Sequence, residues 1–486
     1  MDIQKKVVKG VLWSVIESWG SQAISLIVFF LLARLLSPEA FGLVSMANVF
    51  LAFMNVFLDQ GFAQALIQCK KLEPEHLDTA FWTNLVIGIV LTSSAFVSAD
   101  FVANGFNQPL LTPIIRCFSP LFLITSLGHV QRAILERSFD FKAIANRSLL
   151  GLLISGGVGV TMAFSGFGVW SLVCQQLTNE LVGTFVLWQA SSWRPGLKFS
   201  RNHFNQLFHF GISLLCLNFI GFFNKRGNDF LIGYFLGPST LGFYVLAYRV
   251  LDVMMQLLVR TTGQVALPAF SRLQEDLEKF RNTFYTSTQL TSLIAFPVFF
   301  GLASLAPEVI VILFGGQWQP SIPIVQILAF AGIVQSVSFF KGHILMAMGK
   351  PSWRLWQALL SIVLNLIGFA VAFQWGVIAI SIAYVTRRYI VFPIGQWAIQ
   401  LLIHFSWRTY LRQFITPIVC SIVMVFFIFT LKGLLTNITE SKLLILSTCT
   451  LFGLMTYGTT IRLCAPEVFQ KITDIARIAV STGGCR

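Results

Sequence analysis

The chain has 486 residues, of which 56% are hydrophobic and only 11% are charged. Soluble domains carry about 25% charged residues, so a chain this long and this apolar cannot cover itself with polar surface in water. The net charge of +14 would suit nucleic acid binding in a soluble protein, but in a membrane protein it follows from Lys and Arg in cytoplasmic loops, and we expect no nucleic acid partner.

Apolar stretches of about 20 residues, the length that a helix needs to cross a membrane, recur along the chain. Lipid offers no partners to backbone polar groups, so these stretches must form helices or a closed barrel, and the alternating segments of about 10 residues typical of barrels do not occur. The sequence predicts an all-α membrane protein with about 14 transmembrane helices, at residues 11–35, 41–64, 79–102, 110–134, 147–165, 167–190, 207–235, 240–263, 284–304, 320–347, 353–374, 377–400, 411–431 and 443–463.

Charges in the loops predict the orientation. The termini and the loops after even-numbered spans are rich in Lys and Arg, as at Lys5, Lys70 and Arg194. The loops after odd-numbered spans hold little more than Lys432 and Lys442. Since positive charge stays on the cytoplasmic side, we expect a multi-pass plasma membrane protein with both termini in the cytoplasm.

The chain resembles itself at an offset of 200 residues. Leu36, Pro38 and Gly42 recur as Leu236, Pro238 and Gly242. Such a repeat predicts two pseudo-symmetric six-helix lobes, with the substrate path of a transporter between them. We assign residues 1–200 to an N-lobe, 201–405 to a C-lobe, and 406–486 to two C-terminal spans and a cytoplasmic tail.

Several charged residues fall inside predicted spans, where they are costly and mark function or a watery cavity by default. Basic residues suit an anionic substrate, because Arg offers a flat fork and Lys a point charge to phosphate oxygens. The substrate-binding candidates are Arg116, Lys225, Arg226, Arg249, Lys341, Arg387 and Arg388. The acidic residues are candidates for coupling to protons or sodium: Glu17, Asp59, Glu180, Asp229 and Asp252.

Ion pairing between these charges is the alternative interpretation. Arg249 and Asp252 stand three apart on one helix, a spacing that favours a local pair. Asp229 can pair in the same way with Lys225 or Arg226. The adjacent arginines Arg387 and Arg388 gain nothing from each other, so they favour a functional role. We expect the arginines of both lobes to face one aqueous chamber.

The sequence lacks the usual patterns of catalytic and nucleotide sites. It has no Walker A pattern, no H-E-x-x-H and no G-x-S-x-G. We therefore expect no enzyme, no catalytic residues, no cofactor and no metal site.

Six stretches resemble the polysaccharide branch of the multidrug/oligosaccharidyl-lipid/polysaccharide exporter superfamily, in the subgroup of colanic acid exporters. They are spread over the first two-thirds of the chain, and none is a catalytic signature. The stretches are LARLLSPEAFGLVSMA, ALIQCKKLEPEHLDTAFWTNL, QRAILERSFDFKAIA, LIGYFLGPSTLGFYVLAYRV, PAFSRLQ and LAPEVIVILFGGQW.

The resemblance implies a flippase that moves oligosaccharide repeat units on an undecaprenyl pyrophosphate carrier across the bacterial inner membrane by alternating access. It implies a role in surface polysaccharide biosynthesis, with membrane lipid, a polysaccharide polymerase and export machinery as partners. Two other functions stay open: an ion-coupled multidrug or cation antiporter on the same scaffold, and a membrane glycan polymerase. The antiporter would favour an acidic lumen, and the polymerase would need a large catalytic loop.

Overall fold

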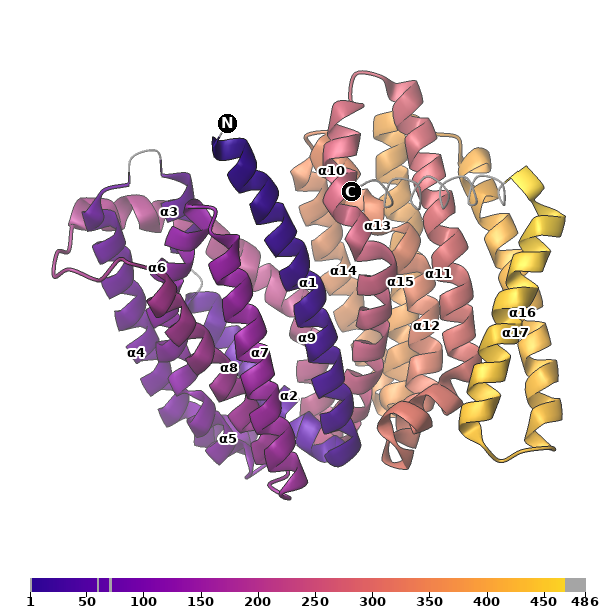
Figure 1. The fold of residues 1–486 in the computed structure, drawn as a ribbon, viewed down its shortest axis with the longest axis horizontal. Helices are drawn as coiled ribbons and strands as arrows, with labels where there is room; N and C mark the ends of the chain where they lie inside the picture. The colour runs from indigo at the N-terminus through magenta and orange to yellow at the C-terminus, as the bar shows by residue number, and fades with distance from the viewer. Residues whose placement is uncertain (1, 59–60, 70–71, 468–486) are drawn as a thin grey trace. The chain divides into compact units, whose positions relative to one another are not determined.

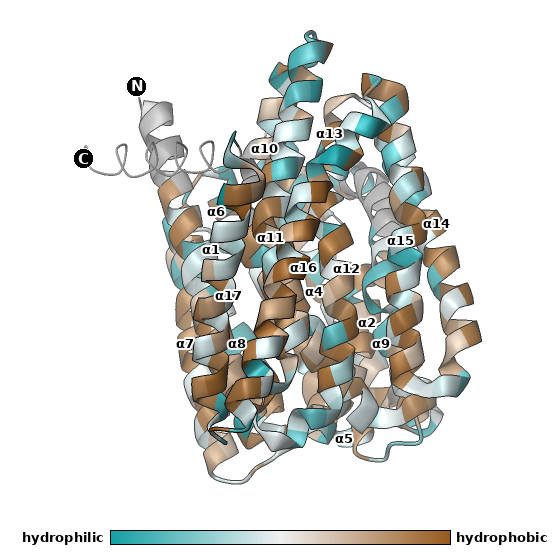
Figure 2. Cartoon of the chain, turned by 90° about the vertical axis from the view of Figure 1, so that its right-hand side faces the viewer, coloured by the Kyte–Doolittle hydropathy of each residue, from teal (hydrophilic) through white to brown (hydrophobic). Residues whose placement is uncertain are grey.

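The computed structural model describes residues 2–58, 61–69 and 72–467, and these form helices joined by short connections, with no strand among them. The chain divides into two compact units, Met1–Val245 and Leu246–Arg486. Figure 2 shows hydrophobic residues along the lengths of the long helices. The prediction of an all-α membrane protein is thus confirmed.

The first unit is built from α1 to α8 and most of α9. Figure 1 shows α1, α7 and α8 packed together in this unit. A second group joins α4 to α6 around a core that includes Phe81 and Val130. The elements are α1 (Asp2–Leu35), α2 (Pro38–Leu58), α3 (Phe62–Gln68), α4 (Pro74–Gly105), α5 (Leu111–Phe118), α6 (Pro120–Arg137), α7 (Phe141–Phe164), α8 (Val169–Ala190) and α9 (Arg201–Met255).

The second unit begins near the end of α9. Helix α12 packs between α11 and α15, and α16 and α17 pack on α11. The elements are η1 (Gln256–Arg260), α10 (Thr261–Arg272), α11 (Leu277–Phe314), η2 (Gly316–Ser321), α12 (Ile322–Val337), α13 (Phe339–Ala347), α14 (Pro351–Ala372), η3 (Phe373–Trp375), α15 (Gly376–Ile403), α16 (Trp407–Thr436) and α17 (Lys442–Cys464).

Eleven segments of the described chain are long and apolar enough to cross a membrane. One of them, Pro351–Ile403, contains both α14 and α15, and another, Asn218–Val259, is broken at Gly237. Helix α8, of 22 residues, lies outside these segments. The count of fourteen spans and the lobe boundaries at residues 200 and 405 stay predictions.

The break at Gly237 lies at the predicted turn between two spans. Its φ of 83° places it in the left-handed region, which a residue without Cβ adopts at no steric cost. Pro238 then starts the second half of α9, where a missing N–H is tolerated. The Gly-Pro pair therefore separates two helices that are otherwise continuous.

The repeated Gly and Pro residues meet each other inside the first unit. A methyl group at Gly42 would lie 1.8 Å from the carbonyl oxygen of Pro238, and one at Gly242 would lie 2.0 Å from the carbonyl oxygen of Pro38. The start of α2 and the second half of α9 therefore touch backbone to backbone, through the same residue types in both directions. This reciprocal contact is what a twofold relation between repeats produces.

A buried ion pair joins the C-terminal helices to the rest of the second unit. Lys432 Nζ of α16 lies 2.7 Å from Glu308 Oε1 of α11, and the Glu308 side chain is only 8% exposed. An apolar cluster that includes Leu293, Met424 and Cys449 links α11, α16 and α17. The two helices that the repeat leaves out are thus part of the second unit's core.

Candidate functional site

Three cationic side chains of the second unit come from neighbouring membrane helices. Lys341 belongs to α13, and Arg387 and Arg388 belong to α15; we call these three residues the cationic cluster. The guanidinium carbons of Arg387 and Arg388 lie 4.9 and 5.1 Å from the ring centroid of Tyr384. Because aromatic faces attract cations, Tyr384 holds both charges against one ring.

Hydrogen bonds orient the two arginines. Arg388 Nη2 donates to the Tyr384 hydroxyl at 2.5 Å, and Arg387 Nη1 donates to the Ser361 carbonyl oxygen at 2.9 Å. Ser361 belongs to α14, which packs on α15. Arg387 is only 7% exposed. The packing of α14 against α15 therefore sets the position of a nearly buried charge.

Gly395 makes room for the third cation. A methyl group at this position would lie 2.7 Å from Lys341 Nζ, so the lysine side chain runs directly over the glycine. Lys341 therefore lies against α15, the helix that carries Arg387 and Arg388. The ring of Tyr248, near the end of α9, packs edge-on against Tyr384 with centroids 6.3 Å apart.

This arrangement suits a multiply charged anion. Three like charges on adjoining helices are costly within a bilayer, and an anion bound among them lowers that cost. Guanidinium groups bind phosphate oxygens in pairs, while an ammonium group binds them as a point charge. The cationic cluster can therefore receive a phosphate or pyrophosphate group.

A polar cavity of about 430 Å³ lies among membrane helices of the first unit. The Ser148 hydroxyl donates to Glu17 Oε1 at 2.6 Å, which joins α7 to α1. Arg147 Nη2 lies 3.3 Å from Glu180 Oε2, which joins α7 to α8. The cavity is lined by Ser14, Glu17, Ser18, Ser21, Arg147, Ser148, Leu152 and Asn179.

Arg147 was not among the residues predicted for a site. Hydropathy placed Arg147 at the edge of a span, whereas α7 begins at Phe141 and carries Arg147 in its second turn. The acidic Glu180, expected to be an ion-coupling candidate, is the partner of this arginine. The helix begins before its apolar stretch, and hydropathy does not reveal this early start.

Three other predicted residues belong to the first unit. Arg116 of α5 pairs with Asp100 of α4 at 2.7 Å, with side chains 40% and 58% exposed, and lies over the ring of Phe96. Arg226 pairs within α9 with Asp229 at 3.1 Å, as the spacing allows. Lys225 lines a small cavity beside Arg226.

Arg249, Asp252 and Asp59 complete the set of predicted residues. Arg249 and Asp252 are half-buried on α9, and their pairing stays a prediction. Asp59 lies outside the described residues.

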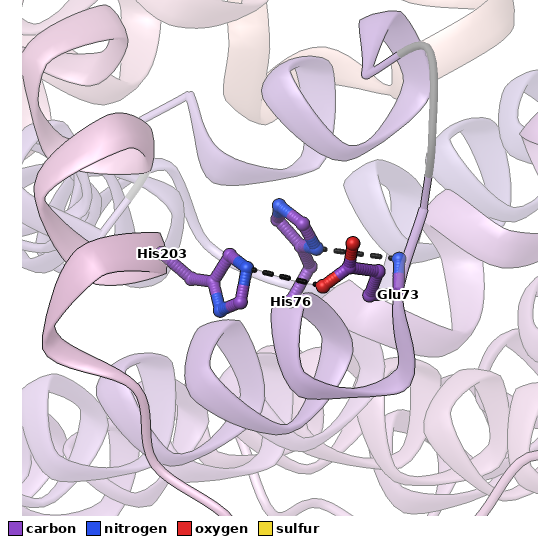
Figure 3. Close-up of side chains that lie close together, drawn as sticks. All are labelled: Glu73, His76 and His203. Carbon is purple, nitrogen blue, oxygen red and sulfur yellow. Dashed lines mark hydrogen bonds and ion pairs between the residues drawn. The ribbon is translucent and has the colours of Figure 1, made fainter.

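Figure 3 shows a separate group of polar side chains at the start of α4: Glu73, His76 and His203. Their ligand-type atoms lie within 4.8 Å of one another. However, His76 Nδ1 accepts a hydrogen bond from the Glu73 N–H at 3.2 Å, and the two imidazole rings lie in contact at a tilt of 50°, with centroids 3.9 Å apart. Imidazoles that bind one zinc ion each point a ring nitrogen at it, with a zinc–nitrogen distance of about 2.0 Å. We therefore interpret this group as a polar contact between α4 and α9.

Comparison with known proteins identifies relatives over most of the chain. Residues 31–323 match the family model described as polysaccharide biosynthesis protein. The chain is 28% identical to the lipopolysaccharide biosynthesis protein WzxC of Escherichia coli (strain K12), over 72% of each chain. It is 29% identical to the succinoglycan biosynthesis transport protein ExoT of Rhizobium meliloti (strain 1021), over 73% of this chain and 72% of that one.

Solved structures share the fold. A lipid II flippase MurJ in an inward closed conformation matches with a TM-score of 0.78 at 15% identity, over 94% of this chain and 99% of that chain. An inward-facing multidrug resistance MATE family transporter of the MOP superfamily matches with a TM-score of 0.63 at 14% identity, over 79% and 96%. The protein is therefore a multi-pass membrane protein with a transporter fold. Because the family model matches more than half of its length, the chain belongs to the polysaccharide biosynthesis protein family.

Proposed function

We propose that the protein flips an anionic oligosaccharide, linked to a polyprenyl pyrophosphate lipid, across the bacterial inner membrane for surface polysaccharide biosynthesis. The cationic cluster is the observation that carries this proposal, because Lys341, Arg387 and Arg388 stand together on membrane helices. The names of the relatives WzxC and ExoT support a role in polysaccharide biosynthesis.

The charge of the cluster favours an anionic substrate over a cationic drug. An antiporter of cationic drugs would need carboxylates where the substrate binds, whereas Arg387 and Arg388 surround Tyr384 instead. The negative charge of two phosphates is complementary to that of three cations, and the phosphate oxygens can accept hydrogen bonds from all three side chains. Pyrophosphate is therefore the part of the substrate that we assign to the cationic cluster.

The polar cavity of the first unit is our candidate for energy coupling. Glu17 receives a hydrogen bond from Ser148, and Glu180 pairs with Arg147. A carboxylate at membrane depth can exchange its proton or bind a cation as access alternates between the two sides. We further propose that both termini are cytoplasmic and that a polymerase and export machinery use the flipped lipid.

The test is a deletion strain complemented by single variants. In cells without the gene, lipid-linked oligosaccharide should accumulate facing the cytoplasm and the surface polymer should be lost. The variants Arg387→Gln and Arg388→Gln, present at normal protein levels, should fail to restore the surface polymer and should leave the lipid-linked oligosaccharide accumulated. Arg132→Gln removes an exposed arginine that pairs with Glu136, and it should complement fully. Normal polymer from both cluster variants would reject the proposal.

A further inference from the structure

A second feature of the first unit bears on how a lipid-linked substrate is held. A cavity of about 480 Å³ lies between α2, α4 and α9. Its lining side chains are apolar, apart from the hydroxyl of one tyrosine. They are Val49, Phe50, Phe53, Phe101, Val102, Phe106, Phe222, Phe223, Phe230 and Tyr234, and Gly105 completes the lining; we call this cavity the aromatic groove.

Aromatic rings from three helices build its walls. Phe53 of α2 and Phe222 of α9 have centroids 5.6 Å apart, and Phe106, just after α4, lies 5.7 Å from Phe230. Phe230 and Tyr234 stand four residues apart on α9 and so share one face, and Phe222, eight residues before Phe230, lines the same groove. From Phe222 to Tyr234 the helix runs about 18 Å, more than half the thickness of the hydrocarbon core.

The aromatic groove adjoins a smaller cavity of about 290 Å³, and Phe222 lines both. The smaller cavity is lined in part by the apolar residues Ala52 and Val56, and its polar lining residues are Asn55 of α2 and Asn218, Lys225 and Arg226 of α9. Arg226 is engaged by Asp229 at 3.1 Å. Among the side chains that the structure describes, Lys225 forms no ion pair with a carboxylate.

An apolar groove that ends at a cation and two amides matches one kind of molecule. It fits a single long hydrocarbon chain with a phosphate at its end and a hydroxyl-rich group beyond the phosphate. A membrane phospholipid has two acyl chains, whereas a polyprenyl phosphate has one. The amides of Asn55 and Asn218 can hydrogen-bond sugar hydroxyls beside the phosphate.

We propose that the aromatic groove receives the polyprenyl chain of the lipid-linked substrate, with Lys225 against its phosphate end, in a step of transport other than the one in which the cationic cluster binds the pyrophosphate. This inference rests on the proposed function and adds a binding site for the lipid anchor. The cationic cluster belongs to the second unit and the aromatic groove to the first, so each can be changed alone.

The test measures binding of radiolabelled geranylgeranyl pyrophosphate to the full-length protein in detergent. Phe53→Ala and Phe222→Ala should each weaken this binding at least tenfold. Both should leave unchanged the affinity for inorganic pyrophosphate, measured separately. Lys225→Gln should weaken binding of the lipid. Phe164→Ala, which removes a 70% exposed phenylalanine of α7, is the matched control and should bind like the wild type.

Three results would overturn the inference. One is wild-type affinity in both phenylalanine variants. Another is a wild-type protein that does not bind the probe. The third is displacement of the probe by equal amounts of dioleoylphosphatidylglycerol, which would make the groove an ordinary lipid site. Failure of the proposed function is distinguishable, because a deletion strain would then make normal surface polymer.

Discussion

Replacing Gly42 by alanine tests the backbone contact that joins α2 to α9. The new Cβ would lie 1.8 Å from the Pro238 carbonyl oxygen, whereas close carbon–oxygen contacts in proteins are about 3.3 Å. Backbone must therefore move by roughly 1.5 Å at the start of one helix. Overpacking of this kind costs about 1–3 kcal/mol, and the helix preference of Ala over Gly offsets about 1 kcal/mol of it.

The same reasoning applies to Gly242→Ala, whose Cβ would lie 2.0 Å from the Pro38 carbonyl oxygen. Both variants should lower the melting temperature of the purified protein. Size-exclusion chromatography of heated samples measures this temperature. Because the two glycines serve one contact, the double variant should lose less than the sum of the single losses. Gly157→Ala is the control, since no atom lies within 4 Å of its new methyl group. Wild-type stability in Gly42→Ala would refute this packing.

Three further predictions concern other charged groups. Lys432→Met leaves the buried Glu308 carboxylate without its ion-pair partner and should lower the free energy of unfolding by about 3–5 kcal/mol. Adding Glu308→Gln to the same chain should largely restore the stability, as thermal melts would show. Glu17→Gln should keep its contact with Ser148 and fold normally, but transport in vesicles should stop responding to an imposed pH gradient; an unchanged response would remove Glu17 from coupling. The backbone N–H of Lys279, followed by its ammonium group, holds the pKa of Asp276 below its ordinary value. Asp276→Ala should therefore lower the melting temperature at pH 7 and make no difference once the pH falls below the folded-state pKa.

The helices follow from composition, because an apolar stretch in lipid has no alternative to pairing its own backbone. The Gly237-Pro238 turn was predictable for the same local reason. Helix ends were less predictable: Gly61 has a φ of 74° and α3 begins after it at Phe62, within one predicted span. Apolar residues on both sides of that break hide it from hydropathy.

The grouping of charges depends on which face of each helix meets its neighbour, and that information is not local. Nothing near Arg116 in the sequence points to Asp100 on another helix. Lys341 packs against the helix that carries the two arginines because Gly395 leaves space for it, which is a property of packing. Arg387 and Arg388 were predicted as a functional pair from adjacency alone, and their common ring, Tyr384, lies one helical turn before them.

The most direct test of the central claim is the rate at which purified protein in liposomes moves polyprenyl-pyrophosphate-linked oligosaccharide between leaflets. A charge-assisted hydrogen bond is worth about 1.5–3 kcal/mol, so Arg388→Gln should slow transfer at least about tenfold. Arg132→Gln should transfer at the wild-type rate. Equal rates for wild type and Arg388→Gln would contradict the assignment of the pyrophosphate to the cationic cluster.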